Sequence, residues 1–186
     1  MASDLTYTFG AVRANRVELV LAGTPRARPR PRHGARIMGK GSAAKAVSFS
    51  YQPTKIRYKN GKPTAESLAW ARAQEWYAAV AAALIPHKPV QPWDGPVRMT
   101  IDVFFARPQR LMKKKSPEGP MRHTAKPDRD NLEKSITDAL TEAGLYLDDS
   151  QICAGEVRKW YVAKGCAPGV IIVAERIPET TGEPCS

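Results

Sequence analysis

The chain has 186 residues and carries 29 Lys and Arg against 18 Asp and Glu, a formal net charge of +11. Its basic excess favours a polyanionic partner, most simply nucleic acid, with an anionic membrane surface as the alternative. No apolar run approaches the roughly 18 residues of a membrane-spanning helix, and the first ten residues lack the charged-then-apolar order of a secretory signal.

The length suits one domain with a substantial core. We expect that domain to span residues 1–177, with a loose lead-in over residues 1–15 and a polar tail over residues 178–186. The three cysteines are odd in number and lack metal-ligand spacing, so we expect reduced thiols in a cytoplasmic protein. They are Cys153, Cys166 and Cys185. The sequence has no P-loop, dinucleotide fingerprint or Ser or Cys nucleophile motif.

The first predicted strand alternates apolar residues at Val17, Leu19 and Leu21 and ends at Gly23. Residues 24–33 then interleave Pro with Arg, which excludes helix and favours extended backbone. Residues 19–65 contain eleven Lys and Arg and no acid. This run is either a solvated or disordered face, or an arm that follows DNA phosphates, because Arg forks match phosphate oxygens. The arm would use Arg26, Arg28, Arg30 and Arg32.

Residues 39–48 are small and polar and predict a mobile loop. Residues 47–58 predict a short strand. Residues 64–84 predict a helix because alanines dominate and apolar residues recur at helical spacing. The predicted buried stripe is Ala69, Ala73, Trp76, Val80 and Leu84. We interpret Trp70, Trp76 and Tyr77 as core or dimer contacts in preference to base-stacking platforms. Residues 86–96 form a proline-rich connector.

Residues 97–105 alternate strictly and predict a strand. Residues 107–127 form a long loop with seven Lys and Arg against one acid, Glu118. Loops of this length are usually functional or disordered. Within it Lys113, Lys114 and Lys115 are candidates for a flexible clamp on DNA. Residues 152–161 and 169–177 predict two further strands, which we expect to pair as a hairpin across a Gly/Pro turn.

A second predicted helix follows Lys126 in the stretch KPDRDNLEKSITDALTEAG. Pro127 lies where a missing N–H does no harm, and Asp128 can cap the first free amides. An apolar stripe then runs to Gly144, a plausible left-handed stop. Its members are Leu132, Ile136, Ala139, Leu140 and Ala143. A separate edge of the helix carries Asp130, Lys134 and Asp138.

Four aspartates lie within about twenty residues of this basic chain: Asp128, Asp130, Asp148 and Asp149. Gathered carboxylates repel one another unless a cation lies between them, and Mg²⁺ prefers carboxylate, water and phosphate oxygens. Taken singly, Asp128 at a helix start and Asp148 in a turn suit ordinary capping. Taken as a set, the four predict a metal site for Mg²⁺, with Mn²⁺ as a substitute.

The same stretch, KPDRDNLEKSITDAL followed by GLYLDDSQI, resembles the signature of the RusA-type Holliday-junction resolvases of bacteria and their phages. The pattern is a basic or His residue, KPD-x-DN, a helix with Lys, then DDSQ. It is met by His123, Lys126, Pro127, Asp128, Asp130, Asn131, Lys134, Asp138, Asp148, Asp149, Ser150 and Gln151. The resemblance implies a Mg²⁺-dependent endonuclease that resolves four-way DNA junctions, and two-fold homodimers. It also supports the acidic set and Lys134 as site residues. Lys126 is a further candidate DNA contact.

Phosphodiester hydrolysis assigns roles to these residues. Asp128, Asp130 and Asp149 are the expected metal ligands, with Asp148 a possible fourth. Lys134 is expected to act as a fixed cation beside the scissile phosphate. Asn131 either organises the helix start or touches the phosphate. The alternatives are a flap- or fork-specific nuclease and a non-catalytic DNA-binding protein.

The predicted fold is one compact α/β domain with a mixed sheet and two main helices. The apolar surface for pairing could come from residues 152–161 or 170–173.

Overall fold

The computed structural model describes residues 7–13, 15–27, 32–38, 45–51, 56 and 58–179. The two main helices are α1 (Ala65–Leu84) and α2 (Arg129–Ala143), and short 3-10 helices within these ranges are η2 (Ile85–His87), η3 (Gln109–Leu111) and η4 (Asp149–Gln151). The strands are β1 (Tyr7–Arg13), β2 (Arg16–Ala22), β3 (Arg32–Met38), β4 (Lys45–Tyr51), β5 (Tyr58–Lys59), β6 (Lys62–Pro63), β7 (Val97–Phe105), β8 (Met121–Arg122), β9 (Ile152–Tyr161) and β10 (Gly169–Arg176).

Six strands form the main sheet in the order β1-β2-β10-β7-β9-β8. Strand β9 runs parallel to β7, and the other neighbouring pairs are antiparallel. The prediction of a mixed α/β fold with two main helices is therefore confirmed. The predicted hairpin is wrong, because β7 lies between β9 and β10. The short connection between the two strands favoured direct pairing. Instead, both strands pair with the apolar β7, which therefore lies between them.

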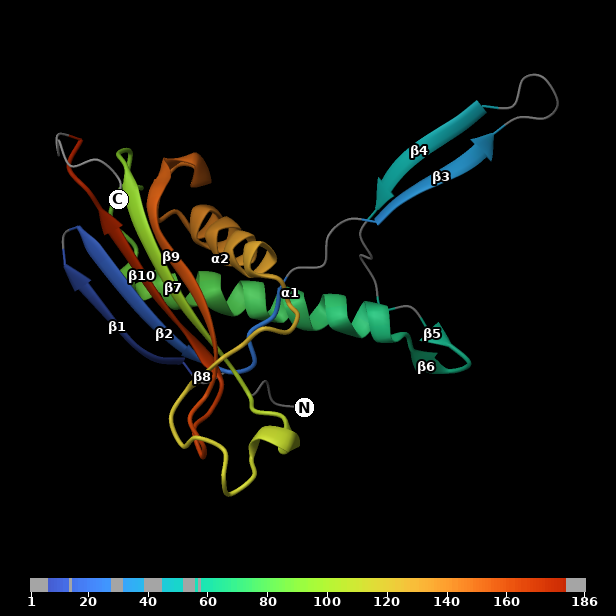
Figure 1. Cartoon of the computed structure of the whole chain (residues 1–186). Coiled ribbons are helices and arrows are strands. Elements are labelled where there is room, and N and C mark those ends of the chain that lie inside the picture. Colours follow the sequence, from blue (N-terminus) through green and yellow to red (C-terminus); the bar gives the residue numbers. More distant parts are fainter. Residues whose placement is uncertain are drawn as a thin grey trace.

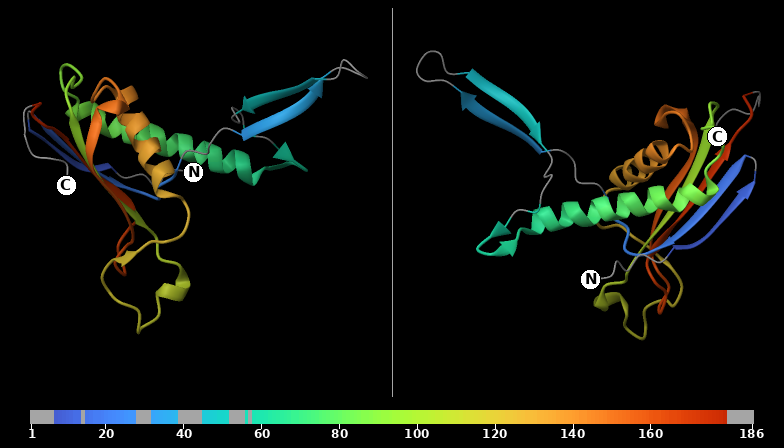
Figure 2. Two further views of the ribbon diagram at one scale, coloured as in Figure 1. Left: turned by 45° about the horizontal axis from the view of Figure 1, so that its top comes forward. Right: turned by 180° about the vertical axis from the view of Figure 1, so that it is seen from behind.

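Both helices pack on one face of this sheet (Figures 1 and 2). Alternation along β7 turns Val97, Met99, Ile101, Val103 and Phe105 inward, and all five are buried. They join the helices and the inward residues of β2 and β10 in one apolar core. The residues that alternate with these inward residues along each strand lie on the opposite face of the sheet.

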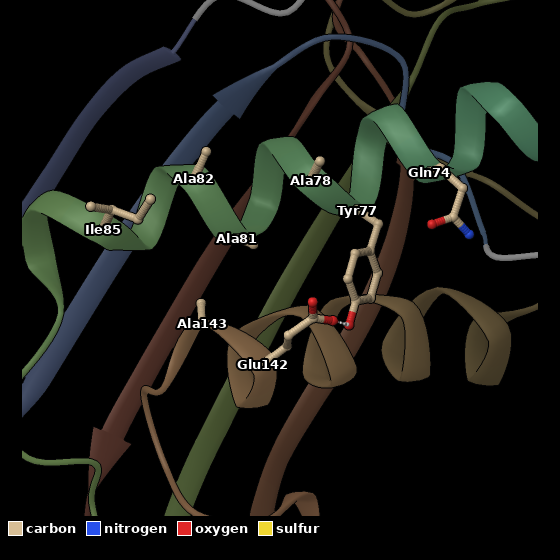
Figure 3. Close-up of a pocket in the computed structure, with 8 residues that line it drawn as sticks. All are labelled: Gln74, Tyr77, Ala78, Ala81, Ala82, Ile85, Glu142 and Ala143. Carbon is tan, nitrogen blue, oxygen red and sulfur yellow. Dashed lines mark hydrogen bonds between the residues drawn. The ribbon is translucent and has the colours of Figure 1, made fainter.

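Helix α1 begins after Thr64, whose hydroxyl accepts a hydrogen bond from the Ser67 amide at 3.4 Å. Of its predicted stripe Ala73, Trp76, Val80 and Leu84 are buried, whereas Ala69 is exposed and that prediction is wrong. Figure 3 shows α1 beside α2, where the Tyr77 hydroxyl donates to Glu142 at 2.6 Å. Trp76 and Tyr77 are therefore core residues, as expected.

The predicted lead-in over residues 1–15 is wrong for residues 7–13, which form β1 and pair with β2. Within the predicted loop at 39–48, Lys45 onward belongs to β4, which pairs with β3 as a hairpin. Figures 1 and 2 show this hairpin projecting away from the sheet and helices. Arg28, Arg30 and Cys185 lie outside the described residues. Over the described ranges, no helix is both long and apolar enough to cross a bilayer.

Candidate active site

Asp128 occupies the N-cap position of α2, but its side chain accepts no capping hydrogen bond. The helix begins at Arg129, so Pro127 directly precedes the cap and its missing N–H removes no helical hydrogen bond. Asp130 lies in the first helical turn and is exposed. The two carboxylates thus lie at the end of the helix whose free amides and dipole favour negative charge. This end of α2 suits an anionic ligand or a cation that the carboxylates share.

The body of α2 confirms the predicted separation between a core side and a polar side. Leu132, Ile136, Ala139 and Leu140 are buried at 1% exposure or less. Gly144 ends the helix in the left-handed region with a φ of 82°, as the sequence predicted. Nearby, the hydroxyl of buried Tyr146 donates to the Thr137 carbonyl at 3.0 Å, and burial raises its pKa. The acidic start of the helix is therefore anchored on a packed core.

The turn before α2 is held by Lys159 of β9. Its ammonium donates to the carbonyl of Ala125 at 2.8 Å and to the carbonyl of Pro127 at 2.7 Å. These are the residues on either side of Lys126, directly before Asp128. The side chain of Lys159 therefore ties the KPD segment to the sheet.

The second pair of acids lies on η4, and its two members have different surroundings. Asp148 caps η4 by accepting from the Ser150 amide at 2.9 Å. Hydrogen bonds from the Ser150 hydroxyl and amide lower the pKa of Asp148. Asp149 follows inside the short helix and is paired with the Lys134 ammonium at 3.8 Å. The capping interpretation thus suits Asp148, whereas Asp149 faces the polar edge of α2.

Lys134 joins the two halves of the motif. Its ammonium donates to Asp138 at 3.3 Å, one helical turn along α2, and lies 3.8 Å from the Asp149 carboxylate on η4. The Lys134 side chain is 70% exposed, so these pairs contribute little to folding stability. Their consequence is positional, because they hold the Lys134 ammonium between α2 and η4.

The carboxylate oxygens of these aspartates fit a hard divalent cation by their chemistry. Carboxylates are the protein ligands that Mg²⁺ prefers, and the side chains of Asp128 and Asp149 are not used for helix capping. Among the described residues, no three His, Cys, Asp or Glu side chains are grouped closely enough to hold one metal ion. The four-aspartate metal site therefore stays a prediction.

His123, the motif's first residue, is buried at 8% exposure. Its ring stacks on Phe105 with centroids 4.2 Å apart, and Tyr161 lies at 4.6 Å. Burial lowers the pKa of His123, and the charge of Lys159 lowers it further. His123 is a packing residue beside the KPD turn.

The basic loop after β7 is tied at its base by Arg107. This buried guanidinium donates to the carbonyls of Val162 and Pro117, both at 2.6 Å, and to those of Glu118 and Gly119. Lys113, Lys114 and Lys115 are exposed farther along the same loop. Arg107 is therefore structural, and the three lysines are left for solvent or phosphate.

The structure thus brings Lys134 together with Asp138 and Asp149, and it places Asp128 and Asp130 at the start of the same helix. Arg26 is described and partly exposed, and Arg32 begins β3. Lys126 is exposed, and Asn131 lies partly buried in the first turn of α2. Sequence reasoning missed the tertiary contacts of Lys159 and Arg107, because nothing in the local pattern distinguishes them from solvated basic residues.

Comparison with known proteins identifies the family of this chain. The family model described as endodeoxyribonuclease RusA matches residues 50–173. The uncharacterized protein YqaN of Bacillus subtilis (strain 168) is 34% identical over 108 residues, which cover 55% of this chain and 74% of that protein. The crossover junction endodeoxyribonuclease RusA of Escherichia coli (strain K12) is 53% identical over 38 residues, 20% of this chain and 32% of that protein.

The family match spans α1, the basic loop, the acidic helix and the DDSQ turn, and it ends within β10. It therefore includes every element that builds the candidate site. The chain belongs to the RusA family of endodeoxyribonucleases.

Proposed function

We propose that this protein is a Mg²⁺-dependent endodeoxyribonuclease that resolves four-way DNA junctions by paired nicks. The observation that carries the proposal is the contact of Lys134 with Asp149, because it joins the acidic helix to the DDSQ turn at 3.8 Å. A metal-dependent phosphodiesterase needs carboxylates and a cation around one phosphate. The partial likeness to the Escherichia coli crossover junction enzyme supports the junction as substrate.

The chemistry divides between the two kinds of charged side chain. Water attacks phosphorus and releases a proton to the solvent, while the bond to the leaving oxygen breaks and that oxygen takes up a proton from the solvent. Lys134 stabilises the extra negative charge of the transition state from a fixed position. Asn131 lies one residue after Asp130 and is proposed to orient the phosphate.

The carboxylates of Asp128, Asp130 and Asp149 are the proposed holders of the divalent cation. A cation held there would lower the pKa of the attacking water and offset the charge of the phosphate. Asp148 is the weaker candidate, because its carboxylate already accepts from Ser150. Without a cation, these acids repel the phosphate that they must approach.

Lys113, Lys114 and Lys115 are proposed to contact DNA phosphates. Replacing all three with Ala is expected to weaken binding to every DNA shape. The slope of log affinity against log salt should fall by roughly 0.9 for each lost duplex contact. Filter-binding titrations at several salt concentrations measure that slope.

Exposed Lys88 provides the matched control, because Lys88→Ala removes a positive charge far along the chain from this loop. Its slope is expected to equal that of the wild type. A triple variant whose slope also equals the wild-type slope would show that the lysines are solvated and do not touch phosphate. Lys126 and the Arg26–Arg32 arm would then be the remaining candidates.

The junction assignment predicts paired activity from a homodimer. One active site per chain can make two symmetric nicks only if two chains act together, and a four-way junction has near two-fold symmetry. The outward face of the sheet, which carries Val20, Phe104, Ile171 and Val173, is where we expect pairing. On it, the charged Arg158 is already paired with Asp102 at 2.6 Å.

An immobile four-way junction, with linear, flap and fork DNA as comparisons, tests the assignment. In Mg²⁺, nicks are expected on two strands of like polarity at matching positions. The solution mass is expected to be close to twice the 20.4 kDa chain mass. A monomer, or a preference for flaps or forks, would remove the resolvase assignment and favour the flap- or fork-specific nuclease. Tight junction binding without any cleavage would favour the non-catalytic DNA-binding protein.

A further inference from the structure

Lys159 makes two hydrogen bonds that bear directly on the acidic helix. Its ammonium is shared between the carbonyls of Ala125 and Pro127, at 2.8 and 2.7 Å. Charge-assisted hydrogen bonds of this length are stronger than neutral ones. They fix the backbone immediately before Asp128, and hence the place from which α2 starts.

Gln151 likewise fixes the backbone of the other half of the site, which is the DDSQ turn. Its amide nitrogen donates to the carbonyls of Trp93 and Gly95, at 3.0 and 2.8 Å. Its amide oxygen accepts from the backbone of Leu147 at 2.8 Å and of Asp148 at 2.9 Å. One side chain thus joins the DDSQ turn to the connector that precedes β7.

The two side chains belong to one continuous segment. Gln151 ends η4, and β9, which carries Lys159, begins at the next residue. Pairing between β9 and β7 extends from Val97 opposite Ile152 to Phe105 opposite Tyr161. The spacing between the two halves of the acidic site is therefore set by β9, which pairs along its whole length with the interior strand β7.

We propose that Lys159 and Gln151 are positioning residues: Lys159 holds the backbone that leads into Asp128 and Asp130, and Gln151 holds the turn that carries Asp149. The inference rests on the proposed function only for the identity of the ligand, which is a divalent cation. Neither side chain is proposed to touch DNA or metal.

Amide hydrogen exchange tests the positioning without DNA or metal. Lys159→Met is expected to speed exchange over residues 125–133 and to leave the Asp148 amide unchanged. Gln151→Met is expected to speed exchange of the Asp148 amide, whose acceptor it removes, and to leave residues 125–133 unchanged. Lys88→Met and Gln91→Met, at exposed positions, are the matched controls.

Direct Mn²⁺ binding tests the consequence for the acidic site. It is measured by the loss of the free-ion signal in electron paramagnetic resonance. Each positioning variant is expected to bind Mn²⁺ at least about tenfold more weakly than its control, the usual effect of removing support behind metal ligands. Lys159→Arg keeps the charge and the donors and is expected to recover most of the affinity. If Lys159→Met does not fold, Lys159→Arg and Gln151→Met still decide the question.

Exchange rates and Mn²⁺ affinities equal to those of the controls would overturn the inference. A wild-type protein that binds no Mn²⁺ and cleaves no DNA would instead overturn the proposed function. In that case the exchange data alone would decide whether the two side chains hold the backbone as proposed. The two failures are therefore distinguishable.

Discussion

Asp130→Asn is expected to lower junction cleavage by at least about a hundredfold while junction binding stays close to that of the wild type. The substitution removes one negative charge from the first turn of α2 but leaves the basic surface unchanged. Because Asn is nearly the same size, the core side of the helix, with buried Leu132 and Ile136, is not disturbed. Single-turnover cleavage and a binding titration in EDTA measure the two effects separately.

Glu133→Gln is the matched control, because it makes the same charge change on the same helix outside the proposed ligand set. It is expected to cleave at close to the wild-type rate. If Asp130→Asn lost folding and binding together, a structural role at the helix start would be the better explanation for this residue.

Chelation of divalent cations is expected to abolish cleavage altogether. The acids of α2 and η4 and the DNA phosphate are all negative, and Lys134 supplies one positive charge among them. Activity is expected to return with Mg²⁺ or Mn²⁺, the hard cations that carboxylates and phosphate oxygens bind. The rate of junction cleavage in EDTA, and after adding back each ion, measures this dependence.

Junction binding provides the internal control for chelation, because the basic loop needs no metal. Binding in EDTA is expected to persist, with Lys113, Lys114 and Lys115 still exposed. Undiminished cleavage in EDTA would contradict the metal site and would require Lys134 and the acids to act in another way.

Local patterns in the sequence determined much of this protein. The 3.6-residue period predicted α2 with its buried Leu132 and Leu140, and the left-handed Gly144 ended it as expected. Strict alternation predicted β7 to the residue, from Val97 to Phe105. These features need only neighbours in the chain, because helix and strand periods fix which side chains share a face. The order and spacing of KPD-x-DN and DDSQ likewise identified the family.

Only the tertiary structure decided which strands pair and which side chains hold the site. Two strands joined by a short turn favour a hairpin, but β7 separates β9 from β10 because both pair with it. Asp148 and Asp149 are alike in sequence, whereas the Ser150 amide and Lys134 give them different surroundings. Lys159 and Ala125 are 34 residues apart, and their hydrogen bond exists only because the sheet brings β9 beside the KPD turn. Local sequence carries no information about such contacts, since they depend on the packing of distant segments.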